Sequence, residues 1–340
     1  MVCLRNSRTL ESQSDVSAEE SLANPVTVVI CAYTKDRWVT LRRAIDVALN
    51  QINFHDELLV VVDHNDALLA RCREYLGNFT VLPNRRDRGL SGARNTALDE
   101  AHGSIIVFLD DDAIPLDGWL DALRAPYVDK QVYGVGGFAK PRWLSGQPEW
   151  FPEEFLWVVG CSHPGLSTGP YPVRNLVGAN MSFRKEAFDD VGGFAEQMGR
   201  IGERLFGCEE TEFSIRLTQA NPDAIILYEP SSQVEHHVTQ QRASLGYFIR
   251  RCWAEGISKA EVSRRVGRSR ALSAERHYVL RVLPKGIWNG LHNSVGGDLW
   301  GAARSIAIVL GLAATVAGYG AGTVYRPLMA TGRRNSRVCL

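Results

Sequence analysis

The sequence lacks closely spaced cysteines, an apolar leader and a net charge. Its seven cysteines include no C-x-x-C pair and are odd in number. This pattern excludes a disulfide framework and a zinc site, and predicts a reduced chain that faces the cytosol. The first 24 residues lack the apolar core of a secretory signal, so we expect a disordered leader there. With 45% apolar and 22% charged residues, the chain is otherwise typical of a globular protein.

The balance of 38 basic and 38 acidic residues hides an uneven distribution. Between Gln241 and Arg304 there are 12 basic and 4 acidic residues, and four more arginines follow Tyr325. The first 240 residues therefore carry an excess of about 12 negative charges. An acidic front half and a basic back half predict two surfaces with different partners. No nucleic-acid-binding motif accompanies the basic half, so nucleic acid is not expected as a partner.

Short apolar runs alternate with helical patterns in the first third of the chain. Runs rich in valine, isoleucine and leucine predict buried strands at 25–33, 56–66, 79–84 and 104–112. Apolar residues at helical spacing predict helices at 37–51, 67–76 and 89–101. Strict alternation of strand and helix indicates βαβ units and a parallel sheet, whose ligands bind where the strands end.

Three adjacent aspartates, Asp110 to Asp112, end the last of these strands in "VFLDDDAIP", with nothing basic beside them in sequence. Burying carboxylates that repel one another is costly unless their charge is neutralised. A divalent cation removes this cost, and Mg²⁺ or Mn²⁺ binds one or two carboxylates together with a diphosphate. A solvated acidic turn is the simpler alternative, and a phosphatase or a receiver domain also ends a strand in acidic residues.

Several motifs, taken in order, resemble glycosyltransferase family 2. They are "VTVVICAYTKDR", "ELLVVVDHND", "GLSGARNTAL", "FLDDDAIP", "GANMSFRKEAF", "VGGF" and "GCEETEFSIRL", and they cover about residues 25 to 240. The resemblance implies an α/β protein with the GT-A fold, a Rossmann-like and mostly parallel central sheet flanked by helices. It also implies an inverting enzyme that uses a nucleotide-sugar donor and a metal ion, Mg²⁺ or Mn²⁺.

The resemblance assigns a role to each matching position. The triple aspartate matches the family's D-x-D motif, in which the first aspartate lies near the donor ribose and the last binds the metal. The implied nucleotide-sugar contacts are Tyr33, Arg37, Asp63, Arg94, Asp110, Asp111 and Asn180, and the implied metal ligands are Asp112 and His237. A structural role is the alternative at each contact: a helix cap for Asp63, loop packing for Tyr33, a surface charge for Arg37 and a salt bridge for Arg94. For Asn180 we expect a loop and a following helix under the donor sugar, with a tight turn as the alternative.

The catalytic base that the family needs falls on "CEETE". The family's catalytic aspartate matches Glu210, although glutamate is one methylene longer and Glu209 stays open as the base. Neighbouring helical residues point about 100° apart, so only one of the two can face the donor. An acidic first turn of a helix is the alternative explanation. In "EHHV", adjacent strand residues face opposite ways, and the family's pattern favours His237 over His236 as the metal or diphosphate contact. Arg242 is a candidate phosphate contact.

These features predict transfer of one sugar to a hydroxyl of a glycan or lipid-linked acceptor. The chain lacks the Q-x-x-R-W motif of the relatives that synthesise polymers. A nucleotidyltransferase is the first alternative function, but no glycine follows the first strand, where its signature would lie. A non-catalytic module that binds sugar nucleotides is the second alternative, and both intact acidic groups argue against it.

The rest of the chain divides by composition. Five aromatic residues between Trp143 and Trp157 suit either an acceptor loop or an ordinary core. We expect a catalytic domain at 25–240, a basic helical region at 241–304, an apolar helix at 305–325 and a basic tail at 326–340. The apolar helix has no charge over 21 residues and is expected either to associate with a membrane or to be buried. Arginines next to it suit anionic headgroups, so we expect the enzyme at the cytoplasmic face of a membrane.

Overall fold

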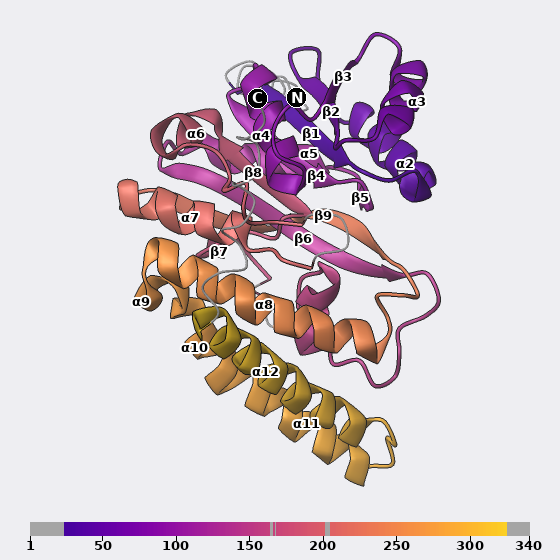
Figure 1. Cartoon of the computed structure of the whole chain (residues 1–340), viewed down its shortest axis with the longest axis vertical. Coiled ribbons are helices and arrows are strands. Elements are labelled where there is room, and N and C mark those ends of the chain that lie inside the picture. The colour runs from indigo at the N-terminus through magenta and orange to yellow at the C-terminus, as the bar shows by residue number, and fades with distance from the viewer. Residues whose placement is uncertain (1–23, 164–165, 167, 201–204, 325–340) are drawn as a thin grey trace, which may run out of the picture.

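The computed structural model describes residues 24–163, 166, 168–200 and 205–324 (Figure 1). The predicted leader, apart from Asn24, and the predicted basic tail lie outside the described residues. The structure has a sheet with helices on both faces at one end and a group of long helices at the other (Figure 1).

The first third of the chain forms the predicted alternation of strands and helices. Each strand is a run of mostly buried apolar residues, and each helix buries one stripe of its surface. Asn65 caps the second long helix, because its side chain accepts a hydrogen bond from the backbone of Leu68. The elements are β1 (Val26–Ala32), η1 (Lys35–Arg37), α2 (Trp38–Leu49), β2 (Glu57–Val62), α3 (Asp66–Leu76), β3 (Thr80–Pro83), α4 (Leu90–Glu100) and β4 (Ile105–Asp110).

The middle of the chain adds antiparallel strands, so the sheet is mixed. Its order is β3-β2-β1-β4-β8-β6-β9-β5, with β7 paired to β9. Parallel pairing holds for the first four strands and for β6 with β9, whereas β8 and β5 run antiparallel to their neighbours. The expectation of a mostly parallel sheet is therefore correct only for its first half. These elements are β5 (Ala113–Pro115), α5 (Trp119–Arg124), η2 (Ala125–Val128), β6 (Val132–Trp143), η3 (Glu153–Val159), β7 (Tyr171–Pro172), β8 (Asn180–Arg184), α6 (Lys185–Val191), α7 (Glu209–Ala220) and β9 (Ile225–Val238).

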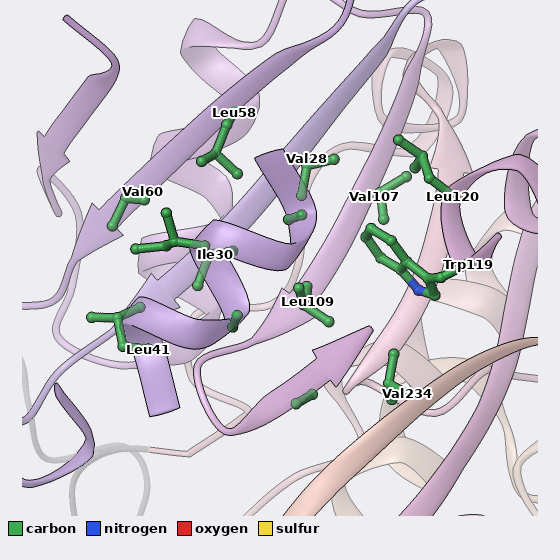
Figure 2. Packing of buried hydrophobic residues seen from close by; sticks show 14 of the residues in the cluster. Val28, Ile30, Leu41, Leu58, Val60, Val107, Leu109, Trp119, Leu120 and Val234 are labelled. Atoms are coloured by element: carbon green, nitrogen blue, oxygen red, sulfur yellow. The ribbon is translucent and has the colours of Figure 1, made fainter. Parts of the chain in front are cut away.

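Alternation along the strands divides the core between the two faces of the sheet. Val28 and Ile30 of β1 face α2 and α5, where they pack with Leu41 and Trp119 (Figure 2). Val29 of β1 points to the other face, which α4, α6 and α7 cover. Both faces of the central strands are therefore buried, which fixes their pairing and the edge at which their polar ends emerge.

The last third of the chain is helical. Its elements are α8 (Leu245–Val266), α9 (Arg268–Ala271), α10 (Ser273–His277), η4 (Tyr278–Val282), α11 (Leu283–Val295) and α12 (Gly301–Val324). A third core joins these helices to η3 through Phe155, Phe248, Leu283 and Ile308. Phe151 and Phe155 are fully buried there, and the nearby tryptophans pack against them, so the aromatic segment is built into a core rather than a free acceptor loop.

Candidate active site

The acidic cluster lies beside residues of the first loop. β4 pairs in parallel with β1, and Asp110 lies opposite Cys31, so the segments after both strands leave the sheet at one edge. Nη1 of Arg37 lies 2.6 Å from Oδ1 of Asp111 and 3.0 Å from Oδ2 of Asp112. Arg37 is therefore part of the acidic cluster and not an isolated surface charge.

Two further basic side chains reach the cluster from the end of β9 and the loop after it. Nε2 of His236 lies 3.1 Å from Oδ1 of Asp112, and Nη2 of Arg242 lies 3.4 Å from its Oδ2. The aspartates, which have no basic residue beside them in sequence, thus have basic neighbours in space. The neighbours come from other parts of the sequence, and they neutralise the buried carboxylates without a metal ion.

These contacts set the protonation of the cluster. Burial alone would raise the pKa of Asp112, but His236, Arg37 and Arg242 hold it well below its usual range. Burial raises the pKa of Asp111 to about 6, although Arg37 opposes this. For His236, burial lowers the pKa, and the charge of Asp112 outweighs that effect and raises it to about 10. Asp112 is consequently ionised more firmly than Asp111.

Three of these side chains could hold a divalent cation, provided that His236 loses the proton that pairs it with Asp112. Ligand atoms of Asp110, Asp112 and His236 all lie within 4.8 Å of one another. Two carboxylates and one imidazole suit Mn²⁺ better than Mg²⁺, which takes oxygen ligands almost alone. The predicted ligand Asp112 is therefore in this group, together with Asp110, for which a ribose contact is expected.

His236, and not His237, faces the acidic cluster. β9 pairs with β5, and His236 lies opposite Ala113 next to the aspartates, so the following residue must point to the other face. Within the described chain, neither ring nitrogen of His237 has a hydrogen-bond partner. Burial and Arg142 lower the pKa of its imidazole. In place of the expected His237, it is His236 that belongs to the group of side chains that could hold a metal ion.

Arg94 joins the two acidic regions. It projects from α4, is only 2% exposed, and lies 3.4 Å from Asp110 and 3.0 Å from Glu209. It also donates to the carbonyl oxygen of Gly178 at 2.9 Å, and a Cβ atom on that glycine would lie 3.3 Å from the same guanidinium. The structure therefore gives Arg94 the salt-bridge role. Gly178 is small because the arginine approaches its backbone.

Replacing Arg94 by methionine is expected to destabilise the protein by about 3–5 kcal/mol, because two largely buried carboxylates lose their partner. Arg86→Met is the matched control on the same segment. Arg86 is 40% exposed and pairs with Asp99 and Glu196 at the surface, so its loss should cost less than about 1 kcal/mol. Denaturant unfolding of both variants measures the difference, and equal losses would contradict the bridging role of Arg94.

The two candidate bases have different surroundings at the start of α7. Glu209 is 4% exposed and is held by Arg94, whereas Glu210 is half-buried. Burial, together with the charge of Glu209, raises the pKa of Glu210 to about 8. The third glutamate of this first turn, Glu212, pairs with Arg216 along the helix at 2.9 Å. Glu210 is thus the residue of the three whose surroundings match a base near neutral pH.

Asp63 and Tyr33 lie at the ends of β2 and β1. Asp63 accepts hydrogen bonds from Asn84 at 2.7 Å and from the backbone of Gly89 at 3.0 Å. Gly89 has a φ of 131°, which favours glycine, so this glycine serves the loop itself. Asp63 is not a helix cap, because Asn65 takes that role. Tyr33 is 42% exposed, with the Arg37 guanidinium carbon 5.3 Å from its ring centre.

Asn180 does not lie in a loop that is open to a sugar. It begins strand β8 and is fully buried. Its Oδ1 accepts from the indole of Trp119 at 2.8 Å, and its Nδ2 donates to the carbonyl oxygen of Ser232 at 3.1 Å. The expected loop is wrong because this segment continues the sheet beside β4, and the polar atoms of Asn180 are used inside the protein.

Sequence reasoning named Arg242 as a phosphate contact but missed Arg200 and Arg251, which lie near it. Burial alone would raise the pKa of the Tyr247 phenol, but Arg200, Arg242 and Arg251 lower it. Burial and the neighbouring arginines lower the pKa of Arg200, whose environment also includes Asp110. The run of basic residues after "EHHV" was the available signal, but the fold was needed to bring Arg200 to it. Arg242 pairs with Asp112 and Arg251 with Glu255, so the protein's own carboxylates offset part of the positive charge that this group offers an anionic ligand.

Comparison with known proteins places this site in a family. The model for glycosyl transferase family 2 matches residues 27–192. A glucosyl-dolichyl phosphate glucuronosyltransferase of Haloferax volcanii is 31% identical over 238 residues, which are 69% of this chain and 76% of that protein. The chain belongs to glycosyltransferase family 2. It is therefore a glycosyltransferase, and the alternatives of a nucleotidyltransferase and a non-catalytic module are set aside.

Other relatives agree with this family and its fold. A pre-mycofactocin glycosyltransferase of Mycobacterium tuberculosis is 30% identical over 199 residues, 54% of this chain and 38% of that protein. A mannosyltransferase of Pyrobaculum calidifontis, solved with GDP-Man and Mn²⁺, has a TM-score of 0.58 at 19% identity, and the match covers 87% of each chain. The expected GT-A fold is confirmed.

Proposed function

We propose that this enzyme transfers one sugar, with inversion, from a UDP- or GDP-sugar to a hydroxyl of a glycan or lipid-linked acceptor. The observation that supports it most is the convergence of Asp110, Asp112 and His236 with three arginines at the ends of the strands. Carboxylates hold a cation that a diphosphate also binds, and arginines bind the diphosphate directly. The Haloferax relative is named for a lipid-phosphate substrate, which supports a lipid-linked acceptor.

We assign each site residue a role in the reaction. Glu210 accepts the proton of the acceptor hydroxyl, which attacks the anomeric carbon on the face opposite the diphosphate. Arg242 and Arg200 bind the diphosphate and stabilise its growing charge. Asp110, Asp112 and His236 would hold Mn²⁺ or Mg²⁺, which supplies further positive charge to the leaving group. Tyr33 and Asp63 would contact the nucleotide, with Asp111 holding Arg37 in place.

The division of the chain and its location extend this proposal. We assign sugar transfer to residues 25–240 and contact with a membrane to the helical region that follows, including 305–325. Each of the five described cysteines is free, which supports a location at the cytoplasmic face. One helix, Gly301–Val324, is long and apolar enough to cross a membrane by length and composition.

A thermal-shift series with UDP- and GDP-sugars, each with and without Mn²⁺, tests the proposed donor. A ligand at about one hundred times its dissociation constant stabilises the folded state by about 2.7 kcal/mol, so at least one donor should raise the melting temperature. The rise should be larger with Mn²⁺, because the cation adds contacts to the diphosphate. A well-folded sample that responds to no nucleotide sugar under either condition would contradict the proposal.

A further inference from the structure

The helix pair α11 and α12 carries an apolar face that nothing in the described chain covers. α12 lies between α8 and α11 at the end of the molecule farthest from β1 to β3 (Figure 1). Its exposed positions all recur at spacings of three and one, which is one stripe of a helix. The stripe contains no charged residue and consists of Ile306, Val309, Leu310, Ala313, Val316, Ala317, Gly320, Thr323 and Val324.

The outer helix repeats this feature. Exposed apolar residues follow one another at spacings of three or four from η4 through α11, and the turn before α12 adds two more. Trp288 is 71% exposed, Val295 90% and Leu299 89%. Exposed tryptophans beside aliphatic side chains are typical of a surface that lies at the headgroup level of a bilayer.

The segment that forms this face is mostly basic, although Glu149, Glu153 and Glu154 line a cavity beside α11. Between Val262 and Val324 the acidic residues are Glu275 and Asp298. Glu275 pairs with Arg174 and Lys259, and Asp298 pairs with Arg304. Exposed basic residues lie before and along α11, namely Arg268, Arg270, Arg276, Arg281 and Lys285. An apolar face bordered by basic residues is complementary to anionic lipid rather than to a neutral protein surface.

α12 cannot leave the body of the protein, because its backbone touches that of α8. A Cβ atom on Gly256 of α8 would lie 2.1 Å from the carbonyl oxygen of Thr315, and one on Gly318 would lie 2.2 Å from that of Trp253. α8 is not a membrane helix, since it carries the Arg251–Glu255–Lys259 ion pairs. If α12 crossed a bilayer, these charges would enter the hydrocarbon layer with it.

We propose that the exposed face of α11 and α12 lies flat in the interface of an anionic bilayer, and that α12 does not cross it. The same packing links this face to the active site. A Cβ atom on Gly311 of α12 would lie 2.5 Å from Phe155 of η3, and one on Gly160, just after η3, would lie 3.1 Å from His236. Only η3 then separates α12, and a lipid-linked acceptor in that bilayer, from His236 in the acidic cluster. Only this last step rests on the proposed function.

Vesicle binding by the full chain tests the surface. Partitioning onto phosphatidylglycerol vesicles should exceed that onto phosphatidylcholine vesicles and should fall as salt is added. Val309→Asp/Val316→Asp, on the α12 stripe, should lower it by at least about tenfold, and so should Trp288→Asp. Phe54→Asp, at a residue 96% exposed near the start of β2, is the control that should bind as wild type. All variants should keep the wild-type melting temperature, because the replaced side chains are exposed.

Depth probes distinguish a flat helix from a crossing one. Nitroxide labels are placed at Ile306→Cys, Ala313→Cys and Thr323→Cys. The background has Cys3 and Cys339 changed to serine, and the same protein without an added cysteine is the blank. All three labels should lie about 5–10 Å below the bilayer surface. A deep central label between two shallow ends would overturn the proposal in favour of a crossing helix. Failure of the wild-type protein to bind either kind of vesicle would overturn the proposal. A dimer that light scattering detects and that Val309→Asp/Val316→Asp dissociates would overturn it in favour of a second copy on this face. None of these readouts needs sugar transfer, so the proposed function and this inference can fail separately.

Discussion

Asp112→Asn should reduce sugar transfer on the order of a thousandfold. The pKa of Asp112 is held well below its usual range, and His236, Arg37 and Arg242 all contact its carboxylate. An amide cannot supply the negative charge that a cation needs from this position. The assay is turnover at saturating Mn²⁺. In parallel, the rise in melting temperature caused by Mn²⁺ and donor together should disappear in the variant.

Folding of this variant needs a separate check. Three basic side chains lose part of their partner, which can cost about 3–5 kcal/mol for a buried pair. Turnover is therefore compared below the melting temperature of the variant, and circular dichroism confirms that it is folded. Asp117→Asn, an exposed aspartate shortly after the cluster, is the control and should keep wild-type turnover. A folded Asp112→Asn with normal turnover and a normal response to Mn²⁺ would remove the metal site from this account.

Local sequence pattern was sufficient for the first half of the sheet. β1 to β4 are short apolar runs, and strands that are consecutive along the chain are also neighbours in the sheet, apart from β3 and β4, because β4 pairs with β1. β8 was missed because Asn180 to Arg184, although it alternates polar and apolar residues, is only five residues long and has no apolar run, and it pairs with β4 and β6. Such pairing depends on contacts distant in sequence, which no short motif contains.

The basic side chains that neutralise the aspartates could not be predicted from the sequence for the same reason. Arg37 and Arg242 are separated from Asp112 by long stretches of chain, and the fold alone brings them within 3.0 Å and 3.4 Å of its carboxylate. The aspartates looked unpaired because pairing was judged from neighbours in sequence. The need for a neutralising charge was correctly inferred. Basic side chains of the protein supply this neutralising charge, and a bound cation would share the site with them.

The choice between adjacent residues also required the fold. Strand alternation established that one of His236 and His237 faces the cluster, but the register of β9 against β5 decided which. At the start of α7, helical geometry likewise allowed only one of two glutamates to face the donor. Glu209 is in contact with Arg94, which supports the proposal that Glu210 has that role.

Glu210→Gln should lower turnover by about 10²- to 10⁴-fold, because glutamine cannot accept the acceptor's proton. Donor binding should stay near wild type, since the side chain acts on the acceptor. In wild type, turnover should rise with pH through the pKa of about 8 and level off above it. The pH profile of turnover and donor titration calorimetry measure these effects. Near-normal sugar transfer by the variant would show that another residue is the base.

The same substitution should make the protein more stable at alkaline pH, which separates a base from a structural carboxylate. The pKa of Glu210 is raised from 4.5 to about 8 in the folded state by burial and by Glu209. Between these values the unfolded chain releases a proton that the folded chain keeps, so wild-type stability falls as pH rises through this window and levels off above it. Glutamine never ionises and avoids this loss. The free energy of unfolding of Glu210→Gln should therefore match that of wild type near pH 4 and exceed it at pH 9, by at most about 5 kcal/mol.

An inactive variant with no gain in stability at pH 9 would show that Glu210 is already ionised in the free enzyme. A base with a pKa near neutral pH would then have to be another residue.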